Sequence, residues 1–166
     1  MKNKYKIFLV LNVVFIFLDQ LTKELIERKF NLYESITIIH KFLYITYIHN
    51  RGGAFGIFSN MPELFLNIFF IAIPLFVMGL ILFMYIKAPN HHRVYLLSLT
   101  LIFSGAIGNF IDRIRFNQVR DFIDVDLTWL PLYRQHWPAF NVADSLICIG
   151  IGLLIIHTLF FETRKS

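Results

Sequence analysis

Four long apolar runs divide this chain and leave it few ways to fold. They cover about residues 7–26, 63–86, 94–112 and 140–161. Each run is long enough to cross the roughly 30 Å of bilayer hydrocarbon as a single α-helix. Backbone in hydrocarbon must satisfy its own hydrogen bonds, which a helix does and an open loop does not. We therefore predict a mainly α-helical membrane protein with four transmembrane helices, forming one domain over residues 1–166.

Composition agrees with this reading. Hydrophobic residues make up 57% of the chain and charged residues only 16%, whereas a soluble domain carries about 25% charged residues. The net charge of +5 does not indicate nucleic-acid binding, because the basic residues are scattered and gather mainly at the chain ends. Basic residues in such positions anchor a protein at the membrane surface. The single cysteine, Cys148, excludes a disulfide within the chain.

The first apolar run resembles a signal peptide, because it follows the basic stretch M-K-N-K-Y-K. No small-x-small cleavage motif follows it, so we expect a retained first span. An even number of spans places both termini on one side, together with the short basic connection 87–93. The positive-inside rule makes that side cytoplasmic. The outer segments hold a similar number of basic residues, but nearly all the acids lie in these segments or near the outer ends of the spans.

Two outer segments connect the spans. Residues 35–49 in the first are rich in β-branched and aromatic residues with partial alternation, which predicts a small interfacial β-sheet between helices 1 and 2. The second, about 113–139, holds Trp129 and Trp137 and is expected to form a lid-like segment between helices 3 and 4. Pro62 suits the start of the second span, and Pro74 predicts a kink within it.

Polar residues gather near the outer ends of the spans, where the membrane makes them costly and therefore informative. Their helical spacing places Asp19 with Lys23 on one face, and Asn141 with Asp144 on another. A structural ion pair explains the first set, and a helix cap explains Asn141. Further polar residues at the same depth are Asn109, Asp112, Arg113, Asp121, Asp124 and Asp126. Several acids thus converge at the outer boundary.

Two carboxyl groups held close together cannot both ionise cheaply, so the pair shares one proton. The ionised member can activate water while the protonated member polarises a carbonyl group. Such a pair hydrolyses a peptide bond with neither a nucleophilic side chain nor a metal. A thiol mechanism at Cys148 lacks a histidine on its helix face, and the six histidines show no metal-ligand spacing.

Over essentially its whole length the chain resembles the lipoprotein signal peptidase (signal peptidase II) family of bacterial membrane aspartyl proteases. Five motifs carry the resemblance, in order: D-Q-L-T-K (19–23), N-R-G-G-A-F-G (50–56), G-A-I-G-N-F-I-D-R (105–113), V-R-D-F-I-D (119–124) and F-N-V-A-D-S (140–145). Each motif alone is weak, but five in order on a four-span chain are specific.

The resemblance implies a multi-pass enzyme of the bacterial cytoplasmic membrane, active near the outer leaflet surface. Its expected substrates are diacylglyceryl-modified prolipoproteins, cut just before the modified cysteine. We expect it to work in membrane lipid as a monomer, without a cofactor or metal. The family pattern makes Asp121 and Asp144 the catalytic residues, a choice that spacing alone does not make. It implies substrate binding by Asn50, Gly53, Asn109, Arg113 and Asn141, and a supporting role for Asp19, Lys23 and Asp112.

The chain departs from the family pattern at three places. Arg120 stands before Asp121 where the family usually has an apolar residue, and we expect its side chain to point outward. Gly53 replaces a commoner alanine, and the segment 125–139 is longer than usual. An inward Arg120 would favour the ionised form of Asp121.

Two other classes of function remain open on sequence grounds. A metal-dependent lipid enzyme could bind magnesium through Asp121, Asp124 and Asp126, and would lose activity with a chelator. A non-enzymatic four-span scaffold could use its polar residues only to join helices, and would tolerate asparagine at Asp121 and Asp144.

Overall fold

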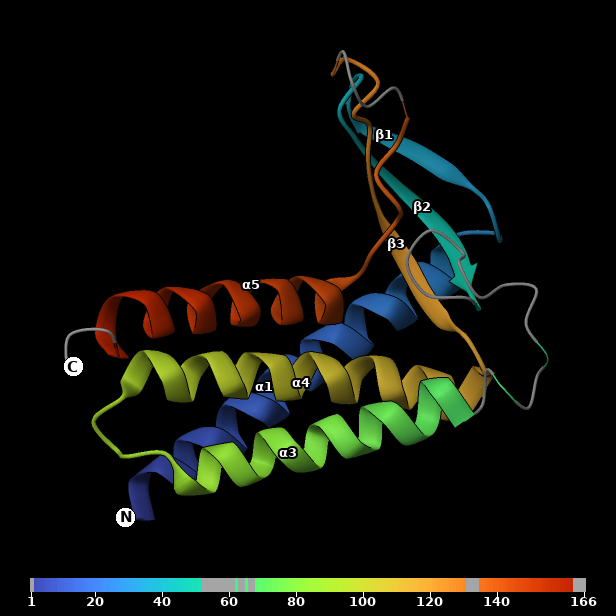
Figure 1. Cartoon of the computed structure of the whole chain (residues 1–166). Coiled ribbons are helices and arrows are strands. Elements are labelled where there is room, and N and C mark those ends of the chain that lie inside the picture. Colours follow the sequence, from blue (N-terminus) through green and yellow to red (C-terminus); the bar gives the residue numbers. More distant parts are fainter. Residues whose placement is uncertain (1, 52–61, 63–64, 66–67, 131–134, 163–166) are drawn as a thin grey trace.

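The structure, a computed structural model, describes residues 2–51, 62, 65, 68–130 and 135–162 (Figure 1). Its helices are α1 (Lys2–Lys29), α3 (Ile73–Lys87), α4 (Arg93–Phe116) and α5 (Val142–His157). A π-helical turn, η2 (Ile68–Ala72), precedes α3, and another, η3 (Thr158–Glu162), follows α5. Four helical stretches among these residues are long and apolar enough to cross a membrane, as the sequence predicted.

The second span changes its helical type near Pro74. The π-helical turn η2 passes into α3 at Ile73, and Pro74 lies in the first turn of α3. A proline there removes a backbone donor where an α-helix would otherwise use it, and a π-helical turn is one way in which a helix accommodates such a break. The residues just after Pro62 lie outside the described part of the chain, so the predicted helix start at Pro62 is not addressed.

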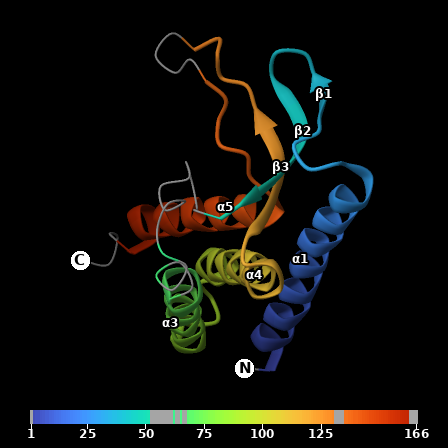
Figure 2. The same ribbon diagram turned by 90° about the vertical axis from the view of Figure 1, so that its right-hand side faces the viewer.

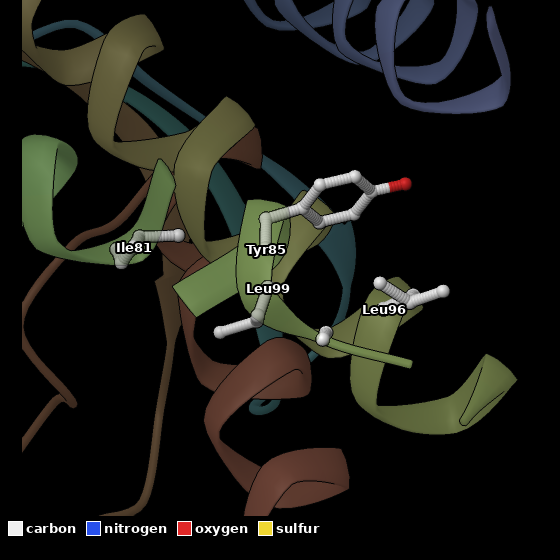
Figure 3. Close-up of a cluster of buried hydrophobic side chains, with 5 residues drawn as sticks. Ile81, Tyr85, Leu96 and Leu99 are labelled. Carbon is white, nitrogen blue, oxygen red and sulfur yellow. The ribbon is translucent and has the colours of Figure 1, made fainter. Parts of the chain in front are cut away.

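Helix α4 forms the centre of the bundle, with α1, α3 and α5 packed around it (Figure 2). Aliphatic residues of α3 and α4 meet around Tyr85, as Figure 3 shows for Ile81, Leu96 and Leu99. Many outer side chains remain exposed, such as Phe76 at 73%. Lipid rather than water is the natural solvent for this apolar surface.

Helices α4 and α5 approach each other closely because glycines face the contact. A Cβ atom added at Gly150 would lie 2.7 Å from Ile102 Cγ1 and 2.8 Å from the backbone oxygen of Ser98. A Cβ atom at Gly105 would overlap the backbone oxygen of Ala143. The start of α5 therefore packs in close contact with α4. This contact positions the polar residues described below.

A three-stranded antiparallel sheet extends from one end of the bundle, opposite the end where α1 begins (Figure 1). Its strands lie in the order β1 (Ser35–Ile39), β2 (Leu43–Asn50) and β3 (Val119–Val125). The predicted sheet between the first two helices is confirmed by β1 and β2. The third strand was not predicted, because its sequence had been assigned to the connection between helices 3 and 4.

The register of β2 and β3 brings distant parts of the chain together. Ile48 pairs with Asp121, and Asn50 pairs with Val119. After β3 the chain returns alongside the strand, and Phe140 exchanges backbone hydrogen bonds with Ile123 at 2.8 and 3.0 Å. This return brings the start of α5 to the base of β3. The outer ends of α4 and α5 and the strands β2 and β3 therefore meet at one place.

Candidate active site

Asp121 lies in β3 with its carboxyl group buried between two amides. The side chain of Asn50 donates to Oδ2 at 2.9 Å, and that of Asn141 donates to Oδ1 at 2.7 Å. Asn50 ends β2, so the sheet register itself sets this contact. The residue is only 2% exposed. Both oxygens of Asp121 are therefore held in fixed directions.

Asp144 lies in the first turn of α5 and forms a capping box with Asn141. The Asn141 side chain accepts from the Asp144 backbone N–H at 3.0 Å, and Asp144 Oδ2 accepts from the Asn141 backbone N–H at 3.1 Å. Asn109 Nδ2 donates to Asp144 Oδ1 at 2.7 Å. The N–H donors on its oxygens and the dipole of α5 stabilise negative charge at this position.

Asn141, a fully buried residue, thus contacts both carboxyl groups. Its backbone N–H binds Asp144, and its amide nitrogen binds Asp121. The predicted cap role of Asn141 is correct, and the structure adds this second role. Asp121 and Asp144 are consequently neighbours through a single shared residue, although they lie on different elements.

Asn109 is held in one orientation by three contacts. Its Oδ1 atom accepts from Lys23 Nζ at 3.0 Å and from Asn141 Nδ2 at 3.1 Å, which leaves its Nδ2 to donate to Asp144. Because the ammonium group of Lys23 has no acceptor, the amide cannot be reversed without losing a bond. Lys23 therefore aligns the donor that meets Asp144.

The pKa of Asp121 is raised from 3.8 to about 7, first by burial of the carboxyl group and then by the nearby charge of Asp144. The amides of Asn50 and Asn141 and the charge of Lys23 oppose this rise. Burial and a like charge both penalise the ionised form, so they act in the same direction. Asp121 therefore holds a proton up to neutral pH.

Below the pair, Asp19 and Lys23 form a fully buried ion pair at 2.9 Å, as their helical spacing predicted. Asp19 also accepts from the backbone N–H of Ala143 at 2.9 Å, in the first turn of α5. Asp112 lies 3.5 Å from Lys23 Nζ. The ion pair of α1, with Asp112 of α4 beside it, thus holds the first turn of α5 in place.

The expectation that Arg120 points outward was wrong as to burial, because the residue is 1% exposed. Its side chain does face away from Asp121, and it binds Asp112 and Glu27 inside the bundle. The reason is strand alternation: consecutive residues of β3 face opposite sides, so a cavity-facing Asp121 turns Arg120 toward α1 and α4. Gln20, which the sequence did not single out, joins the same group through Asp112 and Arg120. Its place beside Asp19 in D-Q-L-T-K was the available signal.

The remaining acids of the outer segment take other partners. Asp124 lies 2.7 Å from His136 Nδ1, and Asp126 accepts from the backbone N–H of Thr128 at 2.8 Å. Hydrogen bonds from the side chain and then the backbone of Thr128 lower the pKa of Asp126. Among the described residues, no three His, Cys, Asp or Glu side chains are grouped to hold a metal. The three acids of V-R-D-F-I-D-V-D therefore do not form one cluster.

A cavity of about 840 Å³ opens beside the carboxyl pair. Its polar end holds Asn50, Asn109, Arg113, Asp121 and Asp144, and the segment Trp137–Phe140 lines one side. The remainder is apolar and lies between α3, α4 and α5, lined by Phe70, Ile73, Val77, Ile102, Ala106, Phe110, Ile147 and Ile151. The cavity thus joins a polar corner to an apolar groove.

Arg113 is a buried residue of this polar end. Its Nη1 atom donates to the backbone oxygen of Arg51 at 2.8 Å, and its guanidinium group lies over the ring of Phe70 at 4.1 Å from the centroid. The guanidinium group can still donate to an extended peptide. Gly53, expected in the substrate groove, lies outside the described residues.

Comparison with known proteins places the chain in a family. The sequence model described as "Signal peptidase (SPase) II" matches residues 11–160. A lipoprotein signal peptidase of Geobacter metallireducens is 43% identical over 166 residues, covering 100% of this chain and 98% of the relative. One from Staphylococcus carnosus is 38% identical over 168 residues, covering 100% and 99%.

Solved structures agree. A bacterial membrane enzyme determined by the in meso method at 2.3 Å resolution superposes with a TM-score of 0.82 and 32% identity, over 97% of this chain and 92% of that chain. A second, at 1.9 Å resolution, gives a TM-score of 0.78, also at 32% identity, over 94% of both chains. Sequence and fold match together over nearly the whole length, and the chain belongs to the signal peptidase II family of bacterial multi-pass membrane proteases.

Proposed function

We propose that this chain cleaves prolipoproteins just before their diacylglyceryl-modified cysteine, with Asp121 and Asp144 as its catalytic pair. The observation that carries the proposal is the position of Asn141, which binds both carboxyl groups at the polar end of an apolar cavity. Membership of the family supports the substrate class, since the relatives are lipoprotein signal peptidases. The apolar groove between α3, α4 and α5 suits lipid-modified, hydrophobic peptide.

In this mechanism Asp121 is the acid and Asp144 the base. Asp121 keeps its proton because its pKa is about 7, and Asp144 is ionised at the N-terminus of α5 with two N–H donors on its oxygens. Asp144 takes a proton from water as the water oxygen bonds to the scissile carbonyl carbon. Asp121 gives its proton to the carbonyl oxygen. The product of this step is a neutral tetrahedral diol.

Collapse of the diol reverses the two roles. Asp121, now ionised, accepts a proton from one hydroxyl group while the C–N bond breaks, and Asp144 gives its proton to the leaving nitrogen. Both side chains then return to their starting states. Asn50, Asn109 and Arg113 lie where their donors can hold the peptide backbone during these steps.

We further propose that the reaction needs no metal and that one chain suffices in the membrane lipid, with both termini cytoplasmic and the pair near the outer surface. In support of the first point, Asp121, Asp124 and Asp126 have separate partners. In support of the second, every residue of the polar corner comes from a single chain. The competing lipid enzyme requires those three acids to gather around one ion.

The proposal is tested by a gel-shift assay with purified enzyme and a diacylglyceryl-modified prolipoprotein. Asp121→Asn and Asp144→Asn should each abolish cleavage, while Asp124→Asn, which changes a half-buried acid paired with His136, should retain it. EDTA should leave the wild-type rate unchanged. Cleavage by either of the first two variants would reject the pair, and loss of activity with EDTA would favour the metal enzyme.

A further inference from the structure

The main chain of residue 120 connects two helices of the site. Its backbone N–H donates to Asp112 Oδ2 in α4 at 3.0 Å. Its carbonyl oxygen accepts from Asn141 Nδ2, at the cap of α5, at 3.3 Å. The next residue is Asp121. The backbone immediately before this carboxyl-bearing residue is therefore fixed from both sides.

The Arg120 side chain adds a third connection, to α1. Nε and Nη2 both bind the carboxylate of Asp112, at 3.2 and 2.8 Å. Nη1 donates to Glu27 at 2.6 Å, and Nη2 donates to Gln20 Oε1 at 3.2 Å. A paired contact of this kind fixes the plane and direction of a guanidinium group as well as its distance.

The carboxylate of Asp112 depends on Arg120 for most of its hydrogen bonds. The carboxylate is fully buried and receives three of its hydrogen bonds from residue 120, whereas Lys23 lies 3.5 Å away. A buried carboxylate left without these donors must find water or move. Losing the guanidinium group should therefore shift the contact between β3 and α4, and Asp121 would move with the strand.

We propose that Arg120 is a positioning residue, which sets the place of the Asp121 carboxyl group relative to Asp144 by tying β3 to α1 and α4. The inference rests on the proposed function of the two aspartates. It assigns a role to an arginine that faces away from the cavity and touches neither the substrate groove nor Asp144.

A direct electrostatic effect of Arg120 and a positioning effect would shift the pKa of Asp121 in opposite directions. Arg120 faces Asp112, Glu24 and Glu27, while the charged groups that act on Asp121 are Asp144, Lys23 and Arg113. If Arg120 acted through its charge alone, removing it would raise the pKa of Asp121. If it acts by position, removing it separates the pair and admits water, and the pKa of Asp121 falls. The alkaline limb of the pH–rate profile distinguishes these two cases.

The test compares Arg120→Met and Arg120→Lys with Arg28→Met. Arg28 is an exposed arginine on α1 that pairs with Glu24 at 2.8 Å, and Glu24 also lies 3.6 Å from Arg120. Its variant therefore removes a guanidinium group from the same region without changing a contact of Asp112. Each purified enzyme is assayed for kcat, KM and the pH dependence of cleavage with the diacylglyceryl-modified substrate. Thermal unfolding in the same detergent gives the fraction folded.

For Arg120→Met we expect kcat per folded enzyme to fall about 10- to 100-fold, since small misplacements of reacting groups have such effects. KM should change less than about threefold, because the groove is intact. The alkaline limb should move about 0.5–1 unit to lower pH. The kcat of Arg120→Lys should lie between those of Arg120→Met and wild type, because an ammonium group retains the charge but cannot make the paired contact. Arg28→Met should match wild type.

A wild-type kcat and alkaline limb in folded Arg120→Met would overturn the inference and leave the catalytic pair standing. So would a limb that moves to higher pH, which indicates a charge effect, or a loss of folded enzyme with an unchanged profile. If Arg120→Met does not fold, Arg120→Lys decides, because a wild-type rate and profile there would equally reject positioning. Cleavage by Asp121→Asn would instead reject the pair itself.

Discussion

Asn141 is fully buried, and its amide nitrogen, amide oxygen and backbone N–H are all used within the site. It caps α5 and at the same time donates one hydrogen bond to the carboxyl group of Asp121 and one to that of Asp144. Two physical roles in one side chain can be separated, because the cap needs only a short acceptor while the contact with Asp121 needs the amide nitrogen.

Replacing Asn141 should separate these roles. Asn141→Ala should lower the free energy of unfolding by about 1 kcal/mol, because the helix cap is lost. It should also lower kcat about 100-fold. Asn141→Ser should recover most of the stability, because serine caps helices, but not the activity, because its hydroxyl cannot reach Asp121. The measurements are thermal unfolding in detergent and the cleavage rate. Equal activity of Asn141→Ser and wild type would show that the contact with Asp121 has no catalytic importance.

The buried proton of Asp121 should also appear in protein stability. Its folded pKa, about 7, lies above the ordinary 3.8, so between these values the folded protein binds a proton that the unfolded chain does not. Stability should therefore fall as pH rises from about 4 to about 7, by up to ~1.4 kcal/mol per unit. The midpoint of thermal unfolding should show this slope in wild type and lose it in Asp121→Asn. Identical slopes in the two proteins would mean that Asp121 ionises normally.

Sequence alone could not choose among the acids at this scale. The structure supplies the reason: Asp112, Asp124 and Asp126 each have a local partner, whereas Asp121 has mainly neutral amides and a second acid nearby. The amides that bind Asp121 belong to Asn50 and Asn141, which are distant from it in the sequence. Arg120 was misplaced for the same reason, because its pocket is made by Asp112 and Glu27 on two other elements.

At the scale of elements, the four helices were predictable because apolar length in a membrane leaves no other fold. Strand β3 was not, because V-R-D-F-I-D-V lacks a simple alternation of apolar and polar residues. Its pairing with β2 joins residues about 70 positions apart, such as Ile48 and Asp121. Such pairing depends on the tertiary contacts more than on local propensity. The sequence likewise did not predict which face of α5 contacts α4.

Two glycines on α5 test that contact face. Gly150 and Gly152 are close in sequence, but a Cβ atom would meet Ile102 and Ser98 at Gly150 and nothing within 4 Å at Gly152. Gly150→Ala should cost about 1–3 kcal/mol through overpacking. Gly152→Ala should be neutral or stabilising by up to about 1 kcal/mol, as alanine favours helices. Thermal unfolding measures both, and equal effects would contradict the seating of α5 on α4.

At the scale of the whole molecule, the sheet and the carboxyl pair lie at one end of the bundle and the α3–α4 connection at the other (Figure 1). A bilayer enclosing the four helices puts these ends in different compartments. We propose that the second end is cytoplasmic, because basic residues lie near the N-terminus and in the connection. The site would then meet its substrate where the outer leaflet meets water.

This orientation can be measured with cysteines introduced at Asn90, in the connection, and Thr128, beyond β3; both residues are exposed. In a Cys148→Ala background, a membrane-impermeant maleimide added to intact cells should label Thr128→Cys and not Asn90→Cys. After the cells are opened, both should be labelled. The opposite pattern in intact cells would invert the proposed topology.

In the proposed mechanism Asp121 and Asp144 share one proton during hydrolysis, and the pH dependence of single-turnover cleavage measures this sharing. Because the pKa of Asp121 is about 7, the rate should fall as pH rises through that value and the acid loses its proton. Wild-type enzyme and diacylglyceryl-modified substrate should be measured from about pH 5 to 9. A tenfold loss of rate for each unit above the midpoint is the predicted result. A rate that stays level or rises up to pH 9 would contradict the shared proton.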